Sequence, residues 1–236
     1  MKKIKWFFFC LLAFIFASCV DETDEYVRPV YLNSDISAAL KECLTVSVDT
    51  AVTHLCDTNG FSQYNEGAYS IGLPSSANDI VSTLTANGHE GMIDSLISKI
   101  NVAAESCGEN VITYYDLAIT NFTFPDPNTI LNGNDSAATD YLKSIKTVYL
   151  LGALNTSVKT KMDASGATAA WNQVLTTYYT YQSQPVSIDI TAHVTKKIVD
   201  GIFSEMYLEE YNVRHNPDHR SSTLMKKIFA LLDYEE

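Results

Sequence analysis

The sequence lacks the short motifs that most often mark catalytic or metal centres. It contains no two cysteines separated by two residues, no H-E-x-x-H, no G-x-S-x-G and no P-loop. His215 and His219 are four residues apart, but Pro217 between them should break the helix that would align them as metal ligands. We therefore expect no metal site, no cofactor and no enzyme activity. An enzyme of unrecognised type is kept as an alternative.

Positive charge is also scarce. The chain has 16 Lys and Arg against 28 Asp and Glu, a formal net charge of −12. So acidic a chain has no phosphate-neutralising face for nucleic acid, and an anionic membrane would not attract it electrostatically. We expect no nucleic-acid partner, and any membrane attachment must come from a lipid.

No disulfide framework is evident. Cys43 and Cys56 fall on one expected helix, 13 residues or about 20 Å apart, which is too far for a disulfide. Cys107 could pair with either of them, so this pairing stays open. The reading we favour is that all three are small core residues or local surface thiols.

The apolar run at the N-terminus is too short to span a bilayer, which takes about 20 residues. It covers 11 residues, Trp6 to Phe16, and follows Lys2, Lys3 and Lys5, as in a signal peptide. Small residues then precede Cys19, which looks like a lipobox and predicts cleavage before Cys19 and its acylation. Ordinary signal cleavage, with Cys19 left free, is the alternative.

Residues 19–33 have the composition of a tether. The acidic run 21–25 resembles the surface-export signal of Bacteroidetes lipoproteins, or is simply a solvated linker. We thus divide the chain into a signal peptide (1–18), a lipidated tether (19–33) and a helical domain (34–236). The signal removes three lysines and no acids, so the charge of −12 becomes −15. The expected location is the outer membrane, lipid-anchored and facing either the periplasm or the cell surface.

Apolar residues recur at helical spacing from Ser34 onward, where Ser34 is the expected N-cap. No convincing strand pattern appears, and Asp57–Ser75 reads as a long loop. The fold predicted is all-α, a single domain of about eight or nine helices. The expected helices cover 34–55, 78–86, 92–107, 109–121, 135–144 with a continuation over 149–162, 169–181, 190–215 and 224–232.

One stretch stands out near the middle of the chain, residues 129–142. Gly133 or Asn134 is expected to take a positive φ and reverse the chain, and Asp135 is expected to cap the next helix. The stretch predicts a tight joint between helices, and its helix N-terminus is a possible anion cradle. The candidate ligand or partner site is Asn132, Gly133, Asn134, Asp135, Ser136 and Thr139.

Secondary candidates lie elsewhere in the chain. Aromatic residues of the 57–75 loop could line a cleft or, as we favour, pin the loop to the core. Glu209 and Glu210 should point to different sides of a helix, which suits solvation or local ion pairs with nearby arginines better than acid–base catalysis. The secondary candidates are Asn59, Phe61, Arg214, Asn216 and Arg220.

Several blocks together resemble the bacterial envelope family called domain of unknown function 4197, from about Ile36 to Phe229. This resemblance implies an exported, largely helical domain, often a lipoprotein, without an established activity. The chain departs from the family at Asn134, where a second glycine is usual, and at Ser221-Ser222, where threonines are. The blocks are Ala39-Leu40-Lys41-Glu42 with Leu44, Asn59-Gly60-Phe61, Ile71-Gly72-Leu73-Pro74, Ala103-Ala104-Glu105, Ile130 to Leu142, Trp171-Asn172, Asp200-Gly201-Ile202-Phe203 with Glu209-Glu210, and Arg214 to Pro217 with Arg220 and Leu224 to Phe229.

The sequence therefore favours a lipid-anchored binding or interaction protein of the cell envelope. Its partner would be a small molecule or an envelope protein, held at residues 132–139, with residues 59–69 as a second candidate stretch. A purely structural envelope lipoprotein, with every candidate residue explained by packing, is the main alternative.

Overall fold

The computed structural model describes residues 29–234 of the chain. Cys19, the signal peptide and most of the expected tether lie outside the described residues, so those predictions stay predictions. All regular secondary structure within residues 29–234 is helical, which confirms the all-α fold in one compact domain.

Ten α-helices and three short 3-10 helices make up the described part of the chain. Two of the α-helices, α2 and α6, are short and were not among the eight or nine expected. The elements are α1 (Asn33–Leu55), α2 (Gly60–Gly67), η1 (Ser75–Ala77), α3 (Asn78–Ala86), α4 (Glu90–Glu105), α5 (Gly108–Thr120), α6 (Pro127–Leu131), α7 (Ala137–Ser165), α8 (Ala167–Tyr178), α9 (Ile190–His215), η2 (Pro217–His219), α10 (Thr223–Phe229) and η3 (Ala230–Tyr234).

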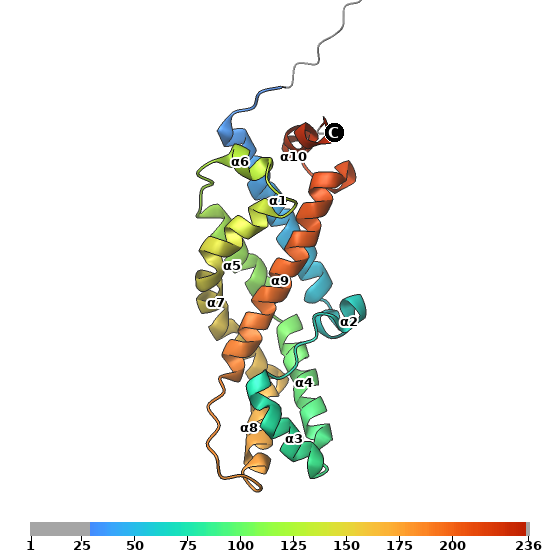
Figure 1. Ribbon diagram of the computed structural model, residues 1–236, viewed down its shortest axis with the longest axis vertical. Helices are drawn as coiled ribbons and strands as arrows, with labels where there is room; N and C mark the ends of the chain where they lie inside the picture. Colours follow the sequence, from blue (N-terminus) through green and yellow to red (C-terminus); the bar gives the residue numbers. More distant parts are fainter. Residues whose placement is uncertain (1–28, 235–236) are drawn as a thin grey trace, which may run out of the picture.

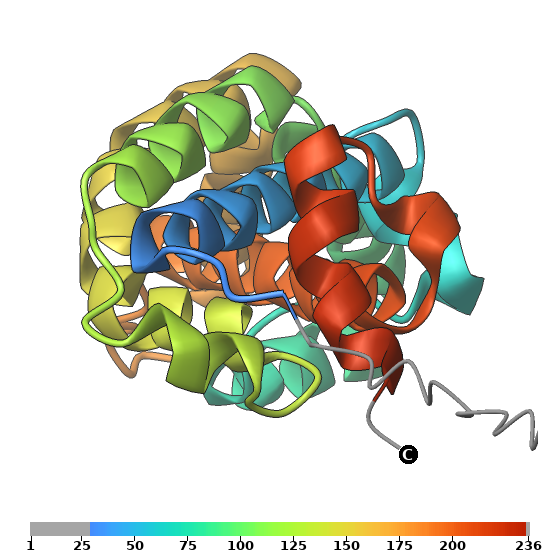
Figure 2. The same ribbon diagram turned by 90° about the horizontal axis from the view of Figure 1, so that it is seen from above.

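The helices form an elongated bundle whose long members run roughly along its axis (Figure 1). α9 packs most extensively against α1 and α7, and Figure 2 shows α1 with other helices on several sides. The start of α1, the short helix α6 and α10 gather at one end of the bundle, while α3 and α8 lie at the other. We call the first of these ends the tether end, because the described chain begins there.

The central position of α9 follows from its sequence. Apolar residues recur every four positions from Ile190 to Met206, with a second row beginning at Val199, so two adjacent sides of the helix are buried. Asp189 caps the helix, since its carboxylate accepts a hydrogen bond of 2.9 Å from the Ala192 amide. The helix expected over 190–215 is confirmed.

Two helix boundaries show where local rules hold and where they fail. α7 is one uninterrupted helix of 29 residues, and Gly166, with φ 77°, ends it between the expected helices 149–162 and 169–181. At the start of α1, however, Leu32 rather than Ser34 occupies the N-cap position and no side chain caps the helix. The prediction of Ser34 as the cap is wrong.

The expected loop at 57–75 contains the short helix α2. Three non-glycine residues here adopt left-handed backbone conformations, namely Asn59 (φ 63°), Asn65 (φ 49°) and Glu66 (φ 58°). Phe61 is buried and its ring meets Gly201 of α9, where an added Cβ would lie 3.2 Å away. The segment is thus held to the core by Phe61, which is the packing role we favoured for it.

The cysteines are free thiols within the described residues. Cys43 and Cys107 are buried and Cys56 is half-buried, and burial raises the pKa of Cys56 to about 12 and that of Cys107 to about 11. Their thiols are therefore almost fully protonated at neutral pH and behave as small core groups.

Gly152 offers a site for stabilisation in the middle of α7. It is exposed, has helical neighbours on both sides, and an added Cβ would meet nothing within 4 Å. We expect Gly152→Ala to raise the free energy of unfolding by about 0.5–1 kcal/mol, because alanine loses less backbone entropy in a helix. Urea denaturation followed by circular dichroism measures the change, and a loss of stability would contradict this account of α7.

Candidate functional site

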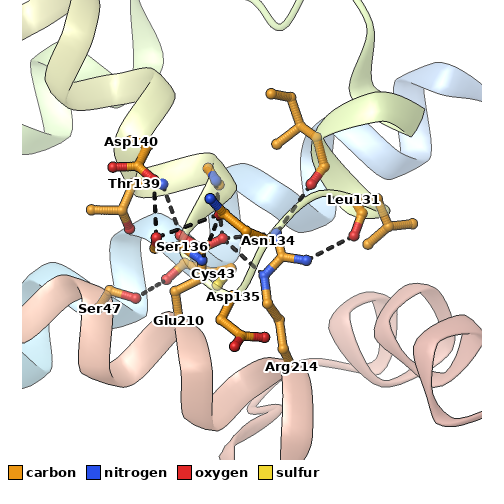
Figure 3. A network of polar contacts seen from close by, with 12 residues as sticks. Cys43, Ser47, Leu131, Asn134, Asp135, Ser136, Thr139, Asp140, Glu210 and Arg214 are labelled. Carbon is orange, nitrogen blue, oxygen red and sulfur yellow. Dashed lines mark hydrogen bonds and ion pairs between the residues drawn. The ribbon is translucent and has the colours of Figure 1, made fainter.

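The N-terminus of α7 is held by a carboxylate from another helix. Glu210 of α9 accepts hydrogen bonds from the amides of Ala138 (3.0 Å, to Oε1) and Thr139 (2.7 Å, to Oε2), as Figure 3 shows. Asp135, the predicted cap, lies outside the helix; Ser136 occupies the N-cap position without a side-chain cap bond. The anion cradle exists, but the chain's own Glu210 fills it.

The turn before α7 is tight for a reason other than the one predicted. Neither Gly133 nor Asn134 has a positive φ, so the expected left-handed reversal is wrong. A Cβ at Gly133 would instead lie 2.7 Å from the Cβ of Ala137 and 3.2 Å from the carbonyl oxygen of Ile130. Glycine is needed here for close approach rather than for backbone freedom.

Arg214 completes a buried cluster with Glu210. Its Nε and Nη2 donate to Glu210 Oε1 at 3.0 and 2.8 Å, and both side chains are almost fully buried. Its Nη1 and Nη2 also donate to the carbonyl oxygens of Leu131 (2.7 Å) and Ile130 (3.1 Å) at the end of α6. We call these two side chains, with the amides and carbonyls they bind, the Glu210–Arg214 clasp. The clasp joins α6, α7 and α9, and it confirms the ion pair expected for Glu210.

Arg220 forms a second buried contact network, with its guanidinium turned into the protein. It donates to the carbonyl oxygens of Val213 and Arg214, both at 2.9 Å, and forms a two-bond ion pair with Asp233 at 2.8 and 2.7 Å. Hydrogen bonding to Arg220 lowers the pKa of Asp233. Arg220 therefore pairs with the last described helix instead of with the glutamates of α9.

Glu209, which precedes Glu210 in the sequence, also has a side-chain partner. Glu209 is buried, and its Oε1 lies 2.9 Å from Nδ1 of His219. Solvation, one of the roles considered for Glu209 and Glu210, is thus wrong for both. Asn216 serves a local turn, since its side chain accepts a hydrogen bond from the Asp218 amide.

A recess opens beside the clasp, on the exposed side of the α6–α7 turn. Asp135 and His215 meet at its rim, 2.6 Å apart and 59% and 52% exposed, and the ring of Tyr211 lies against His215. The recess has a volume of about 190 Å³. We call it the α6–α7 recess; its lining residues are Asn132, Gly133, Asp135, Arg214, His215 and Leu232.

The structure brings some of the predicted site residues together and separates others. Three primary candidates and Arg214 line the recess. Ser136 lies at the start of α7, where its amide donates to the Asn134 side chain and its hydroxyl donates to Asp140. Asn59 and Phe61 lie with α2, away from the tether end (Figure 1). His215 and Leu232 were not predicted to line this site, because their approach to Asp135 and Asn132 depends on contacts across 80 residues of sequence or more.

A further polar cluster, between α1, α2 and α9, was not foreseen. Glu205 of α9 is buried, and its Oε2 lies 2.7 Å from Nδ1 of His54, which stacks on Tyr64. Burial raises the pKa of Tyr69, and the nearby Glu205 carboxylate raises it further. The other oxygen of that carboxylate, Oε1, is buried without a hydrogen-bond partner among the described residues. These contacts join α2 to α1 and α9, so we assign the cluster to holding α2 in place.

Within residues 29–234 no helix combines the length and apolar character needed to cross a bilayer. In the same residues, no three or more His, Cys, Asp or Glu side chains come together in a group that could hold a metal ion.

Comparison with known proteins supplies a family and nothing finer. Neither the curated proteins nor the solved structures contain a match to this chain. A family model described as "Protein of unknown function (DUF4197)" matches residues 31–230, nearly the whole of the described helical domain. This agrees with the resemblance carried by the sequence blocks, several of which build the clasp. The chain belongs to the DUF4197 family of proteins of unknown function.

Proposed function

We propose that this chain is an exported, lipid-anchored protein of the cell envelope that binds a small polar molecule in the α6–α7 recess. The observation that carries the proposal is the recess itself. It gathers an amide, a carboxylate and an imidazole at one solvent-facing site beside a rigid buried cluster. A site supported by such a cluster needs little reorganisation to bind.

The size and charge of the recess narrow the class of ligand. Its volume of about 190 Å³ is below the 300–1,000 Å³ typical of pockets for drug-sized ligands, which favours a molecule of a few heavy atoms. Arg214 contributes little net charge, because Glu210 neutralises it and α6 carbonyls take up its donors. Recognition would therefore rest on hydrogen bonds with Asn132, Asp135 and His215.

The anchor is supported by the sequence features that precede the helical domain. Lys2, Lys3 and Lys5, the apolar run and the small residues before Cys19 follow the order of a lipoprotein signal. An acylated Cys19 would attach the domain to the outer membrane despite its strong negative charge. No enzyme activity is part of the proposal.

Substitution of His215 tests the recess directly. We expect His215→Gln to lower the fraction of chain carrying a bound small molecule at least tenfold, because it removes the imidazole and its contact with Asp135. Native mass spectrometry of the lipidated chain, purified gently in detergent, measures this fraction as an extra mass lost on denaturation.

His219→Gln is the matched control for this experiment. Like His215, His219 is partly exposed and paired with a carboxylate, here that of Glu209, but it lies outside the recess. It should leave the bound mass unchanged. An equal effect of both substitutions, or a wild-type chain without any bound mass, would contradict the small-molecule proposal.

A structural role is the second candidate, and the clasp is the observation that favours it. Glu210 and Arg214 find their partners entirely within the chain, so neither side chain needs a ligand to explain it. Under this reading the recess is a by-product of tight packing at the α6–α7 turn, and substitutions there would change stability alone.

A further inference from the structure

The tether end of the bundle has the composition of a surface that meets lipid. The first described residues run over it, and among them Val30 is 96% exposed and Leu32 is 70% exposed. Pro29 and Tyr31 line a shallow pocket together with Lys226 and Lys227 of α10. Both lysines are exposed, and neither forms an ion pair within residues 29–234.

The proposed anchor would hold this end close to a membrane. Pro29 lies ten positions after Cys19, and ten fully extended residues span at most about 36 Å. The start of α1, α6 and α10 therefore cannot leave the neighbourhood of the bilayer surface, whereas α3 and α8 lie at the far end of the bundle (Figure 1).

We infer that the tether end rests on the phospholipid surface, with Val30 and Leu32 inserted among the headgroups and Lys226 and Lys227 reaching lipid phosphates. This inference rests on the proposed lipid anchor. Exposed apolar side chains gain by leaving water at the interface, and lysines extend their ammonium groups to the headgroups while their stems stay against apolar surface.

The neighbouring charges decide which kind of lipid surface fits. Asp35 lies half-buried in the first turn of α1, and Asp126, which caps α6, is exposed. These carboxylates oppose attraction to a strongly anionic surface, so the contact suits a surface rich in phosphatidylethanolamine. Asn132 lines the α6–α7 recess and also a second pocket, which Pro29 and Val30 help to line. The recess would therefore open next to the bilayer.

Tryptophan fluorescence tests this contact. Trp6 is removed with the signal peptide, and Trp171 is buried. The emission of a tryptophan introduced at residue 30 is therefore obtained by subtracting the emission spectrum of the wild-type chain. The lipidated Val30→Trp chain is reconstituted in vesicles of phosphatidylethanolamine and phosphatidylglycerol, 3:1, in which the phosphatidylethanolamine carries bromine on its acyl chains. We expect the added emission to fall at least twofold relative to unbrominated vesicles, and the same for Leu32→Trp.

Val148→Trp is the matched control, because Val148 is apolar and 85% exposed but lies 11 residues into α7, about 17 Å along its axis. Its emission should be unaffected by bromine. Quenching of Val30→Trp no greater than that of Val148→Trp, in a chain whose intact mass shows acylation, overturns the surface contact and leaves the anchor standing. A chain without acyl groups overturns both the anchor and the contact that rests on it.

Discussion

Replacing Glu210 by glutamine should lower the free energy of unfolding by about 3–5 kcal/mol, the usual cost of removing one partner from a buried ion pair. Glutamine keeps the shape of the side chain but leaves the buried Arg214 without a counter-charge, and it weakens the bonds to the Ala138 and Thr139 amides. Urea denaturation of the mature chain, made with Cys19→Ala to keep it free of lipid, measures the loss.

Two comparisons separate the clasp from surface electrostatics. Asp135→Asn breaks an exposed pair and should cost no more than about 1 kcal/mol. Glu210→Met combined with Arg214→Met should cost less than Glu210→Gln alone, because no charge is then left buried. Equal, small losses for Glu210→Gln and Asp135→Asn would show that the clasp does not hold α6, α7 and α9 together.

Gly60→Ala should cost about 3 kcal/mol or more, at the upper end of what overpacking usually does. A Cβ at this position would lie 2.4 Å from the carbonyl oxygen of Leu55 and 2.6 Å from that of His54. Both are backbone atoms at the end of α1, so relief requires the end of that helix to shift. The change would also disturb the contacts of Phe61 and His54 with α9.

The same urea titration measures this effect. Gly91→Ala is the matched control, since Gly91 also lies in the first turn of a helix and an added Cβ there meets nothing within 4 Å. We expect Gly91→Ala to be neutral or slightly stabilising. If Gly60→Ala were tolerated equally well, the close packing of α2 against α1 would be wrong.

The fold could be predicted from the sequence wherever apolar residues recur at helical spacing along the chain. The helix expected over 190–215 and the interruption expected between 162 and 169 depend on neighbours within one or two helical turns, and both are confirmed. The short helices α2 and α6 were missed for opposite reasons. α2 is built from polar residues and held by the burial of Phe61, while α6 has only five residues, too few to show a period.

The candidate site was predictable only in part. The stretch 129–142 does contain the turn on which the site is built, but a local capping rule assigned the α7 N-terminus to Asp135. The true partner, Glu210, is 72 residues away from Ala138 and competes successfully because α9 places it, buried, against the helix end. The pair of His54 and Glu205, 151 residues apart, leaves no local trace for the same reason.

The clasp and the recess together explain which side chains are buried and which are exposed in residues 130–142 and 209–215. Buried members hold three helices together, while the exposed rim residues Asp135 and His215 pair with each other and stay accessible to solvent. This division explains why Gly133 must be small without a left-handed backbone, and why Asp135 lies outside the helix it was expected to cap.

The most direct test of the central claim, an envelope protein anchored by lipid, is the intact mass of the chain isolated from the membranes of its own host and denatured. The account predicts a chain that begins at Cys19 and carries the added mass of acyl groups on that residue. A chain that still begins at Met1, or one that begins near residue 19 without acyl groups, would contradict it.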